Sequence, residues 1–140
     1  MTTVGDLDPA DRALVETAHD LLRERYVEGR HEVAAAVRMR SGAVHLGLHV
    51  ESSIGRASIC AEGIAIGAAL MAGDREIDTI AAVLRLPDGG WRVVSPCGLC
   101  RELIGDYGPS AQVIDFSGGE VRKAPIASLL PSKTLRRWAW

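Results

Sequence analysis

Cys60-Ala61-Glu62 and Pro96-Cys97-Gly98-Leu99-Cys100 are the two stretches that decide how this chain folds and what chemistry it carries. Together they contain all three cysteines of the 140 residues. Three thiolates can hold a zinc ion and leave its fourth position open, which is typical of a catalytic rather than a structural zinc site. A glutamate two residues after the first ligand can exchange protons with water at that open position. We therefore predict that the three cysteines bind Zn²⁺ and that Glu62 is the catalytic acid and base.

Other roles for the cysteines fit the sequence less well. A redox dithiol would use Cys97 and Cys100 but would not need Cys60. A closed structural zinc site would need a fourth ligand, and the four histidines lie upstream in no ligand-like pair with the cysteines. An odd number of thiols and an N-terminus without a secretion signal disfavour a disulfide framework. Three unpaired thiols favour a reducing compartment, so we expect a cytoplasmic protein.

Length and composition limit the class of protein. A chain of 140 residues with 47% hydrophobic and 24% charged residues is expected to form a single domain over 1–140. A formal net charge of −2 gives no polycationic surface of the kind that nucleic-acid-binding proteins show. The longest mostly apolar stretch, residues 63–73, is too short to span a membrane. We accordingly expect neither a nucleic acid polymer nor a membrane among its partners.

Hydrophobic periodicity and turn residues predict an alternation of helices and strands. Asp8-Pro9 is typical of a helix start, with an N-cap followed by proline at the first helical position. Helices are expected over 9 to about 28, 60–72, 97–107 and 125–130, and strands over 33–39, 44–50, 77–86, 91–94, 111–116 and 120–123. This order predicts an α/β fold, a three-layer α/β/α sandwich around a mixed five-stranded sheet.

Both cysteine motifs then lie at strand-to-helix junctions. The partial positive charge of a helix N-terminus lowers the pKa of a thiol and so favours the metal-binding thiolate. Cys97 and Cys100, three residues apart, project from one face of the same helical turn. The expected fold therefore suits the predicted zinc site.

Longer segments around both motifs resemble the cytidine deaminase family, the small zinc-dependent pyrimidine nucleoside deaminases. Gly47 to Ile54, followed by Cys60-Ala61-Glu62, is similar to the family's G-x-N-V-E-N-A-S and C-A-E. Ser95 to Glu102 is similar to its S-P-C-G-x-C-R-Q, and Leu129-Leu130-Pro131 to its late L-L-P. The resemblance covers residues 10–131 or so, which we expect to form the core of the domain.

The resemblance implies an activity and a set of roles. The three cysteines would bind Zn²⁺, and Glu62 would shuttle protons while a hydroxyl replaces the amino group of a cytosine-type ring and ammonia leaves. Main-chain groups of Ala61 and Ser95 would hold the substrate. The enzyme class would be a hydrolase that acts on carbon–nitrogen bonds of cyclic amidines.

The resemblance also implies a homotetramer, which is usual in the family when its subunits are this short. The apolar helix after Cys60 and the terminal Trp138 and Trp140 carry surface that association could bury. We expect these tryptophans to pack across an oligomer interface.

Residues expected to face the sugar depart from the family pattern. His49 stands in place of a ribose-binding Asn, whereas the ribose-binding Glu is retained as Glu51. His31 stands where the family has an aromatic residue that packs on the nucleoside, and Ser52-Ser53 replace Asn-Ala. We predict that His31, His49 and Glu51 contact the substrate, and that the substrate is a modified or non-standard cytidine analogue.

A further departure concerns the sulfur ligands. Gly63 replaces an arginine that, in family members with three cysteines, hydrogen-bonds the ligand sulfurs. Three thiolates leave zinc with a net charge of −1, which weakens it as a Lewis acid, so a compensating donor matters. Arg101 or Arg56 is expected to take this role.

Two other functions remain open. One is deamination of another amidine- or guanidine-like heterocycle, including a nucleoside antibiotic of the blasticidin kind, which His31 and His49 suggest. The other is a non-catalytic zinc-binding protein, although such a protein would not need Glu62. Editing of a polynucleotide fits poorly, because aromatic residues make up only 4% of the chain.

Overall fold

One mixed β-sheet runs through the middle of the protein, whose computed structural model describes residues 2–134. Its strands are β1 (Val33–Met39), β2 (Val44–Leu48), β3 (Ile77–Arg85), β4 (Trp91–Val93), β5 (Gln112–Ser117) and β6 (Glu120–Pro125). Across the sheet the order is β2-β1-β3-β5-β6, and β4 pairs with β3 off this path. β3 and β5 are parallel, and the other neighbouring strands are antiparallel.

The predicted mixed sheet is confirmed. Five strands follow one another across it, and β4 is a sixth, short strand that pairs with β3 outside this order. β3 pairs with β5 through Thr79 and Ile80, and with β4 through the segment from Val83 to Arg85. Two strands thus share one edge of β3. β4 therefore ends close to β5, and the chain continues from it into the second cysteine motif.

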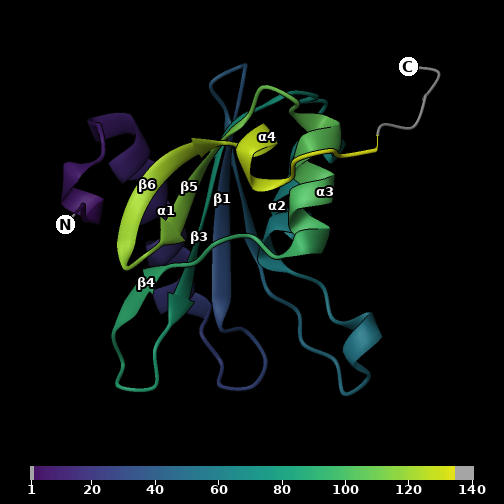
Figure 1. The fold of residues 1–140 in the computed structure, drawn as a ribbon. Helices are drawn as coiled ribbons and strands as arrows, with labels where there is room; N and C mark the ends of the chain where they lie inside the picture. The colour runs from purple at the N-terminus through teal and green to yellow at the C-terminus, as the bar shows by residue number, and fades with distance from the viewer. Residues whose placement is uncertain (1, 135–140) are drawn as a thin grey trace.

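Helices cover both faces of the sheet, which gives the three predicted layers (Figure 1). α1 (Pro9–Arg25) packs on one face, and α2 (Ala61–Met71) and α3 (Gly98–Tyr107) pack on the other. The remaining helices are the short α4 (Ile126–Leu129) and the 3-10 helices η1 (Val4–Asp6) and η2 (Gly55–Ala57). Among residues 2–134, no helix is both long and apolar enough to cross a membrane.

The central strands are apolar on both sides because each face is covered. Ala34 and Ala36 of β1 are buried with the residues of α1, whereas Ala35 and Val37 belong to the cluster under α2 and α3. A strand buried on both faces shows a continuous apolar run instead of an alternating pattern. Burial on both faces explains why the sequence from Val33 to Met39 is almost continuously apolar.

The start of α1 is as predicted and its end is not. The side chain of Asp8 accepts a hydrogen bond from the backbone N–H of Asp11 at 2.9 Å, which caps the helix. The helix stops at Arg25, before the predicted end near Glu28, because residues 27 and 31 pair in an isolated bridge. Gly29 closes this turn in the left-handed conformation with a φ of 72°. The turn delivers His31 to the beginning of β1.

Trp138 and Trp140 lie outside the described residues, and so does the predicted interface that involves them.

Candidate zinc centre

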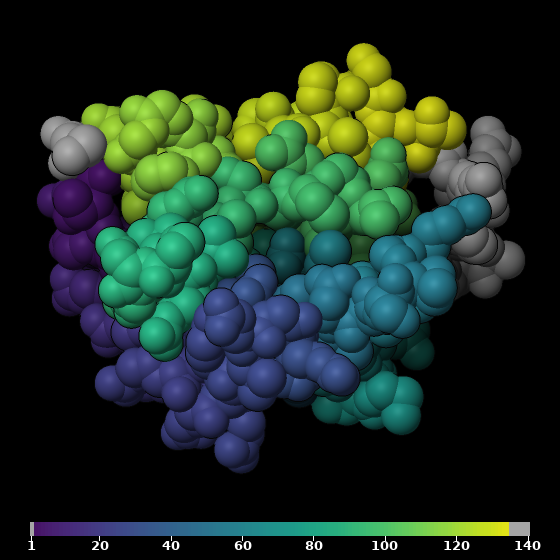
Figure 2. Space-filling model, turned by 90° about the horizontal axis from the view of Figure 1, so that it is seen from below, coloured from purple at the N-terminus to yellow at the C-terminus, as the bar shows by residue number. Residues whose placement is uncertain are grey.

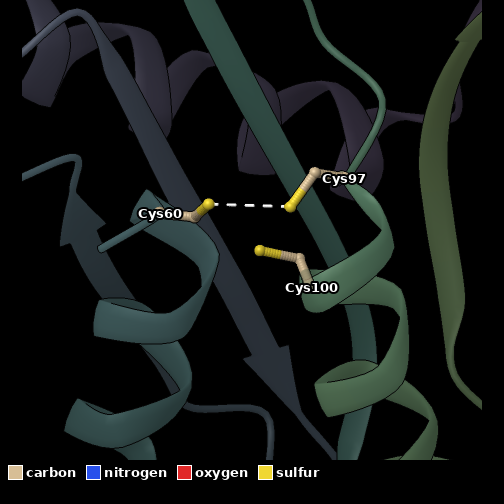
Figure 3. Close-up of side chains that lie close together, drawn as sticks. All are labelled: Cys60, Cys97 and Cys100. Carbon is tan, nitrogen blue, oxygen red and sulfur yellow. Dashed lines mark hydrogen bonds between the residues drawn. The ribbon is translucent and has the colours of Figure 1, made fainter. Parts of the chain in front are cut away.

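The three cysteines lie at the first turns of α2 and α3. Cys60 is the N-cap of α2, Cys97 is the N-cap of α3, and Cys100 follows in the first turn of α3. Their Sγ atoms all lie within 4.8 Å of one another, and the Sγ atoms of Cys60 and Cys97 are 3.6 Å apart (Figure 3). A tetrahedral zinc ion with Zn–S bonds of about 2.3 Å would hold its sulfurs about 3.8 Å apart. The sulfur trio therefore fits a zinc ion.

Burial and the neighbouring charges shift the pKa values of the three thiols in different directions. Burial raises the pKa of Cys100 and of Cys60, and the nearby Glu62 raises both further. Burial also opposes ionisation of Cys97, but the backbone N–H of Cys100 and the neighbouring thiols outweigh it, so the pKa of Cys97 is lowered. Three thiolates and a carboxylate at this range need a positive charge between them, and a divalent cation supplies it.

Glu62, the second residue of α2, is buried, with 5% of its surface exposed. Burial raises the pKa of its carboxyl group, against the opposing effects of its own backbone N–H and of the Cys100 thiol. The interaction with Cys100 places the carboxyl group beside the sulfur trio. A buried carboxyl group at this position is suited to give and take protons next to a metal ion.

Ser95 fixes the loop that leads to Cys97. Its hydroxyl donates to the carbonyl oxygen of Phe116 at 2.7 Å and accepts from the N–H of the same residue at 3.2 Å. These two bonds tie the loop to β5. The main chain that follows Val94 is therefore held in place beside the zinc centre.

Arg101 braces the same loop from the other side. Its Nε donates to the carbonyl oxygen of Pro96 at 2.9 Å, and its Nη1 donates to the carbonyl oxygen of Leu129 at 3.0 Å. These bonds go to carbonyl oxygens and join the loop to the end of α4. Arg56, the other arginine considered for contact with the sulfurs, lies exposed in η2.

The residues expected on the sugar side form a hydrogen-bonded chain. Nε2 of His49 donates to Oε2 of Glu51 at 2.9 Å, and the hydroxyl of Ser58 donates to Oε1 at 2.7 Å. Ser58 and then His49 lower the pKa of Glu51 through these bonds. Nδ1 of His31 donates to the carbonyl oxygen of His49 at 2.8 Å. Sequence reasoning missed Ser58, because no motif marks a hydroxyl that only the turn at η2 brings to Glu51.

Backbone contacts bring this chain of residues close to the zinc centre. Val50 and Ile59 exchange two backbone hydrogen bonds, at 3.0 and 2.9 Å, so Glu51 and Cys60 extend from the same bridge. In Figure 2, which shows the molecule from below, a central hollow separates the segments around residues 30–60 from those around 90–105. The structure thus gathers the cysteines, Glu62, Ala61, Ser95, His31, His49 and Glu51 at one end of the sheet.

Comparisons with known proteins agree with this geometry. A family model described as the cytidine and deoxycytidylate deaminase zinc-binding region matches residues 9–115. Over 136 residues, the chain is 42% identical to blasticidin-S deaminase of Bacillus cereus, covering 94% of this chain and 96% of the relative. A cytidine deaminase of Halalkalibacterium halodurans is 30% identical over 104 residues, which is 73% of this chain and 76% of the relative.

Solved structures of cytidine deaminases share the fold. The enzyme from Burkholderia pseudomallei superposes with a TM-score of 0.72 at 31% identity, covering 87% of this chain and 97% of that chain. The enzyme from Mycobacterium tuberculosis superposes with a TM-score of 0.72 at 27% identity, covering 91% of this chain and 97% of that chain.

Proposed function

The chain belongs to the cytidine and deoxycytidylate deaminase family, and we propose that its substrate is a cytosine-type nucleoside with a modified sugar or another non-standard group. It is a zinc-dependent hydrolase that acts on carbon–nitrogen bonds of cyclic amidines. The observation that supports the reaction best is the meeting of three cysteine sulfurs with one buried glutamate at the N-termini of α2 and α3.

The proposed roles follow from this arrangement. Cys60, Cys97 and Cys100 would hold Zn²⁺, which would lower the pKa of a water molecule and polarise the reacting centre. Glu62 accepts one proton from the attacking water and gives it to the ring nitrogen. It then accepts the remaining hydroxyl proton and gives it to the amino group, so ammonia leaves as oxygen replaces nitrogen. Main-chain groups of Ala61 and Ser95 orient the ring. Residues 10–131 or so form the working core of this domain.

The sugar side supports a substrate other than plain cytidine. His31, His49 and Glu51 are linked by hydrogen bonds, and both carboxylate oxygens of Glu51 already accept one each. A site built in this way selects for groups that match its unpaired donors and acceptors. The relative named blasticidin-S deaminase is more similar to this chain, and over more of its length, than the cytidine deaminase relative. We take a nucleoside antibiotic of the blasticidin type as the best representative of the substrate class.

A homotetramer is the proposed assembly, because α2 is apolar on its outer side as well as its inner side. Ile64, Gly67, Ala68 and Met71 form an outward stripe at helical spacing, and Met71 is 89% exposed. An apolar stripe of this kind is suited to pack against a second copy of the chain. The three free thiols would stay reduced in the cytoplasm, which is the proposed compartment.

A substrate panel tests the proposed function. Zinc-loaded protein would be incubated with cytidine, deoxycytidine, cytosine and blasticidin S, and the released ammonia would be measured. We expect blasticidin S to give the highest kcat/KM. Release from none of these cytosine compounds would contradict the proposed reaction, whereas a higher kcat/KM for cytidine would contradict only the proposed substrate class.

A further inference from the structure

Cys97 is the most exposed of the three candidate zinc ligands. Cys100 is buried and Cys60 is half-buried, whereas Cys97 is exposed at the start of α3, where the loop from β4 ends (Figure 3). As the N-cap residue it has an extended backbone, with a φ of −68° and a ψ of 171°. A side chain that little packing surrounds depends on its backbone for a fixed position.

Arg101 holds the peptide groups on both sides of Cys97. Its backbone N–H donates to the carbonyl oxygen of Cys97 at 2.9 Å, and its side-chain Nε donates to the carbonyl oxygen of Pro96 at 2.9 Å. The carbonyl oxygen of Pro96 and the Cα atom of Cys97 lie in one plane, because the peptide group that joins them is planar. The bond from Nε therefore restricts rotation of the peptide group that carries the ligand.

The other end of the guanidinium group is tied to α4. Nη1 of Arg101 donates at 3.0 Å to the carbonyl oxygen of Leu129, the last residue of α4. Carbonyl groups in the last turn of a helix lack a partner within the helix, so they can accept from a side chain. α4 is itself attached to the core, since Ile126 is buried and its N–H donates to the carbonyl oxygen of Ala111 at 2.9 Å. Arg101 thus links the zinc loop, residues 94–97, to a fixed point.

Compensation of charge would be a different role for Arg101. Three thiolates would leave zinc with an excess of negative charge, which a donor at the sulfurs could offset. Both side-chain bonds of Arg101, however, go to backbone carbonyl oxygens. Hydrogen bonds from a charged donor are strong, and the rigid fork of a guanidinium group fixes its two acceptors relative to each other. This geometry favours positioning over compensation of charge.

We propose that Arg101 is a positioning residue of the zinc centre, which holds Pro96 against the end of α4 and thereby fixes Cys97. The proposal rests on the function proposed above, because it assigns a role around the same zinc site. The bond to Pro96 also steadies Ser95, whose main-chain groups are proposed to orient the ring. Loss of Arg101 should therefore weaken both zinc retention and substrate binding.

The rate of zinc release is the first test. Zinc-loaded protein would be mixed with an excess of chelator, and the appearance of zinc would be followed over time. Arg101→Met removes the donors and keeps an unbranched apolar stem, so it should release zinc about 10- to 100-fold faster, the usual effect of losing a group that orients a metal ligand. Arg101→Lys should release zinc nearly as fast, because it keeps the charge and lacks the planar fork. Release at the wild-type rate in either variant would overturn the proposal.

Lys133→Met is the matched control. Lys133 joins the segment after α4 to α3 as well, by ion pairs with Glu102 and, at 3.0 Å, with Asp106, and neither partner belongs to the zinc loop. Its loss should leave the rate of zinc release unchanged. Equal acceleration in Lys133→Met and Arg101→Met would show that any link between this segment and α3 has the same effect, and would also overturn the proposal. Circular dichroism would establish that each variant is folded.

The spectrum of bound cobalt tests the position of the ligands directly. Co²⁺ in place of zinc absorbs visible light in a way that depends on the geometry of its ligands. The Co²⁺ spectrum of Arg101→Met should differ from that of the wild type, whereas the spectrum of Lys133→Met should not. Identical spectra in the wild type and Arg101→Met would contradict a positioning role.

Zinc release and the cobalt spectrum need no turnover, so they separate this proposal from the proposed reaction. In steady-state kinetics, Arg101→Met should also lower kcat/KM, in part through a higher KM, because Ser95 is no longer steadied. If cytosine compounds are deaminated but Arg101→Met retains zinc as the wild type does, the positioning proposal is wrong and the proposed reaction stands. If Arg101→Met loses zinc faster but the wild type deaminates no cytosine compound, the positioning proposal stands and the proposed reaction is wrong.

Discussion

At the residue scale, Glu62 and the three cysteines carry the proposed chemistry, and His49 and Glu51 carry the proposed specificity. The two sets of side chains are held in position in different ways. The first set lies in the first turns of two helices, where backbone geometry fixes each side chain. The second set lies at the end of β2 and in the loop beyond it, where side chains hold one another. The catalytic set should therefore depend little on substitutions in the specificity set.

Glu62→Gln should nearly abolish turnover while zinc binding and fold remain. The amide cannot accept or deliver the protons, and proton transfer by a placed group is worth about 10²–10⁴-fold in rate. The measurement is kcat on the best substrate of the panel, with zinc content and circular dichroism as controls. A variant that keeps kcat within threefold of the wild type would exclude the proposed role.

His49→Asn should shift the preference towards cytidine. The imidazole donates to Oε2 of Glu51 at 2.9 Å, and a shorter amide would leave that oxygen for a ribose hydroxyl. We expect the ratio of kcat/KM for cytidine to kcat/KM for blasticidin S to rise about tenfold, which corresponds to one hydrogen bond to a charged group. His45→Asn is the control, because His45 bonds to Asp74 at 2.8 Å outside the candidate site. An unchanged ratio in His49→Asn would show that position 49 does not set specificity.

At the element scale, the contact between α2 and β2 positions the first zinc ligand. Gly47 of β2 lies directly under the first turns of α2. A Cβ atom at Gly47 would lie 2.2 Å from the carbonyl oxygen of Ala61 and 2.3 Å from the backbone nitrogen of Ala65. Both neighbours are backbone atoms, so the helix itself would have to move. Only glycine allows α2 to approach the sheet this closely.

Gly47→Ala should therefore disturb the zinc centre as well as the fold. Overpacking of this kind costs about 1–3 kcal/mol, and the displaced helix carries Cys60 and Glu62. We expect a lower free energy of unfolding in urea and faster loss of zinc to a chelator. Gly55→Ala is the control, because a Cβ atom there meets nothing within 4 Å. Equal zinc retention in the two variants would contradict the positioning role of this contact.

The sequence allowed most elements to be predicted, because apolar runs and turn residues have local signatures. The strand Val33–Met39 and the cap at Asp8 appear in the structure as expected. The end of α1 could not be placed, because a bridge between Val27 and His31 overrides local helix propensity there. The sharing of one edge of β3 by β4 and β5 depends on pairing between distant segments, which no single run of residues encodes.

The candidate site, too, could be predicted from the sequence only in part. Cysteine spacing predicted a cluster, and the Sγ atoms do meet within 4.8 Å. The bond from Ser58 to Glu51 and the hydrogen bonds of Arg101 to Pro96 and Leu129 could not be predicted. Such contacts depend on where loops bring side chains after folding, and sequence spacing carries no record of that.

At the scale of the whole molecule, the outward stripe of α2 predicts association. The purified chain should have four times the subunit mass of 14.9 kDa by light scattering at micromolar concentration. Ala68→Glu places a charge in the middle of the exposed stripe, so it should reduce the mass, because an unpaired charge is costly at an apolar interface. Glu24→Gln, an exposed change on α1, should leave the mass unchanged. A wild-type mass near that of one subunit would contradict the proposed tetramer.

The central claim is that three cysteines hold a zinc ion with which this chain deaminates a cytosine-type ring. The most direct measurement is ammonia release from blasticidin S as zinc is removed with a chelator and then titrated back. We expect that release stops in the zinc-free protein and returns in proportion to added zinc, up to one ion per chain. Undiminished release from zinc-free protein, or no release from protein that holds one zinc per chain, would contradict it.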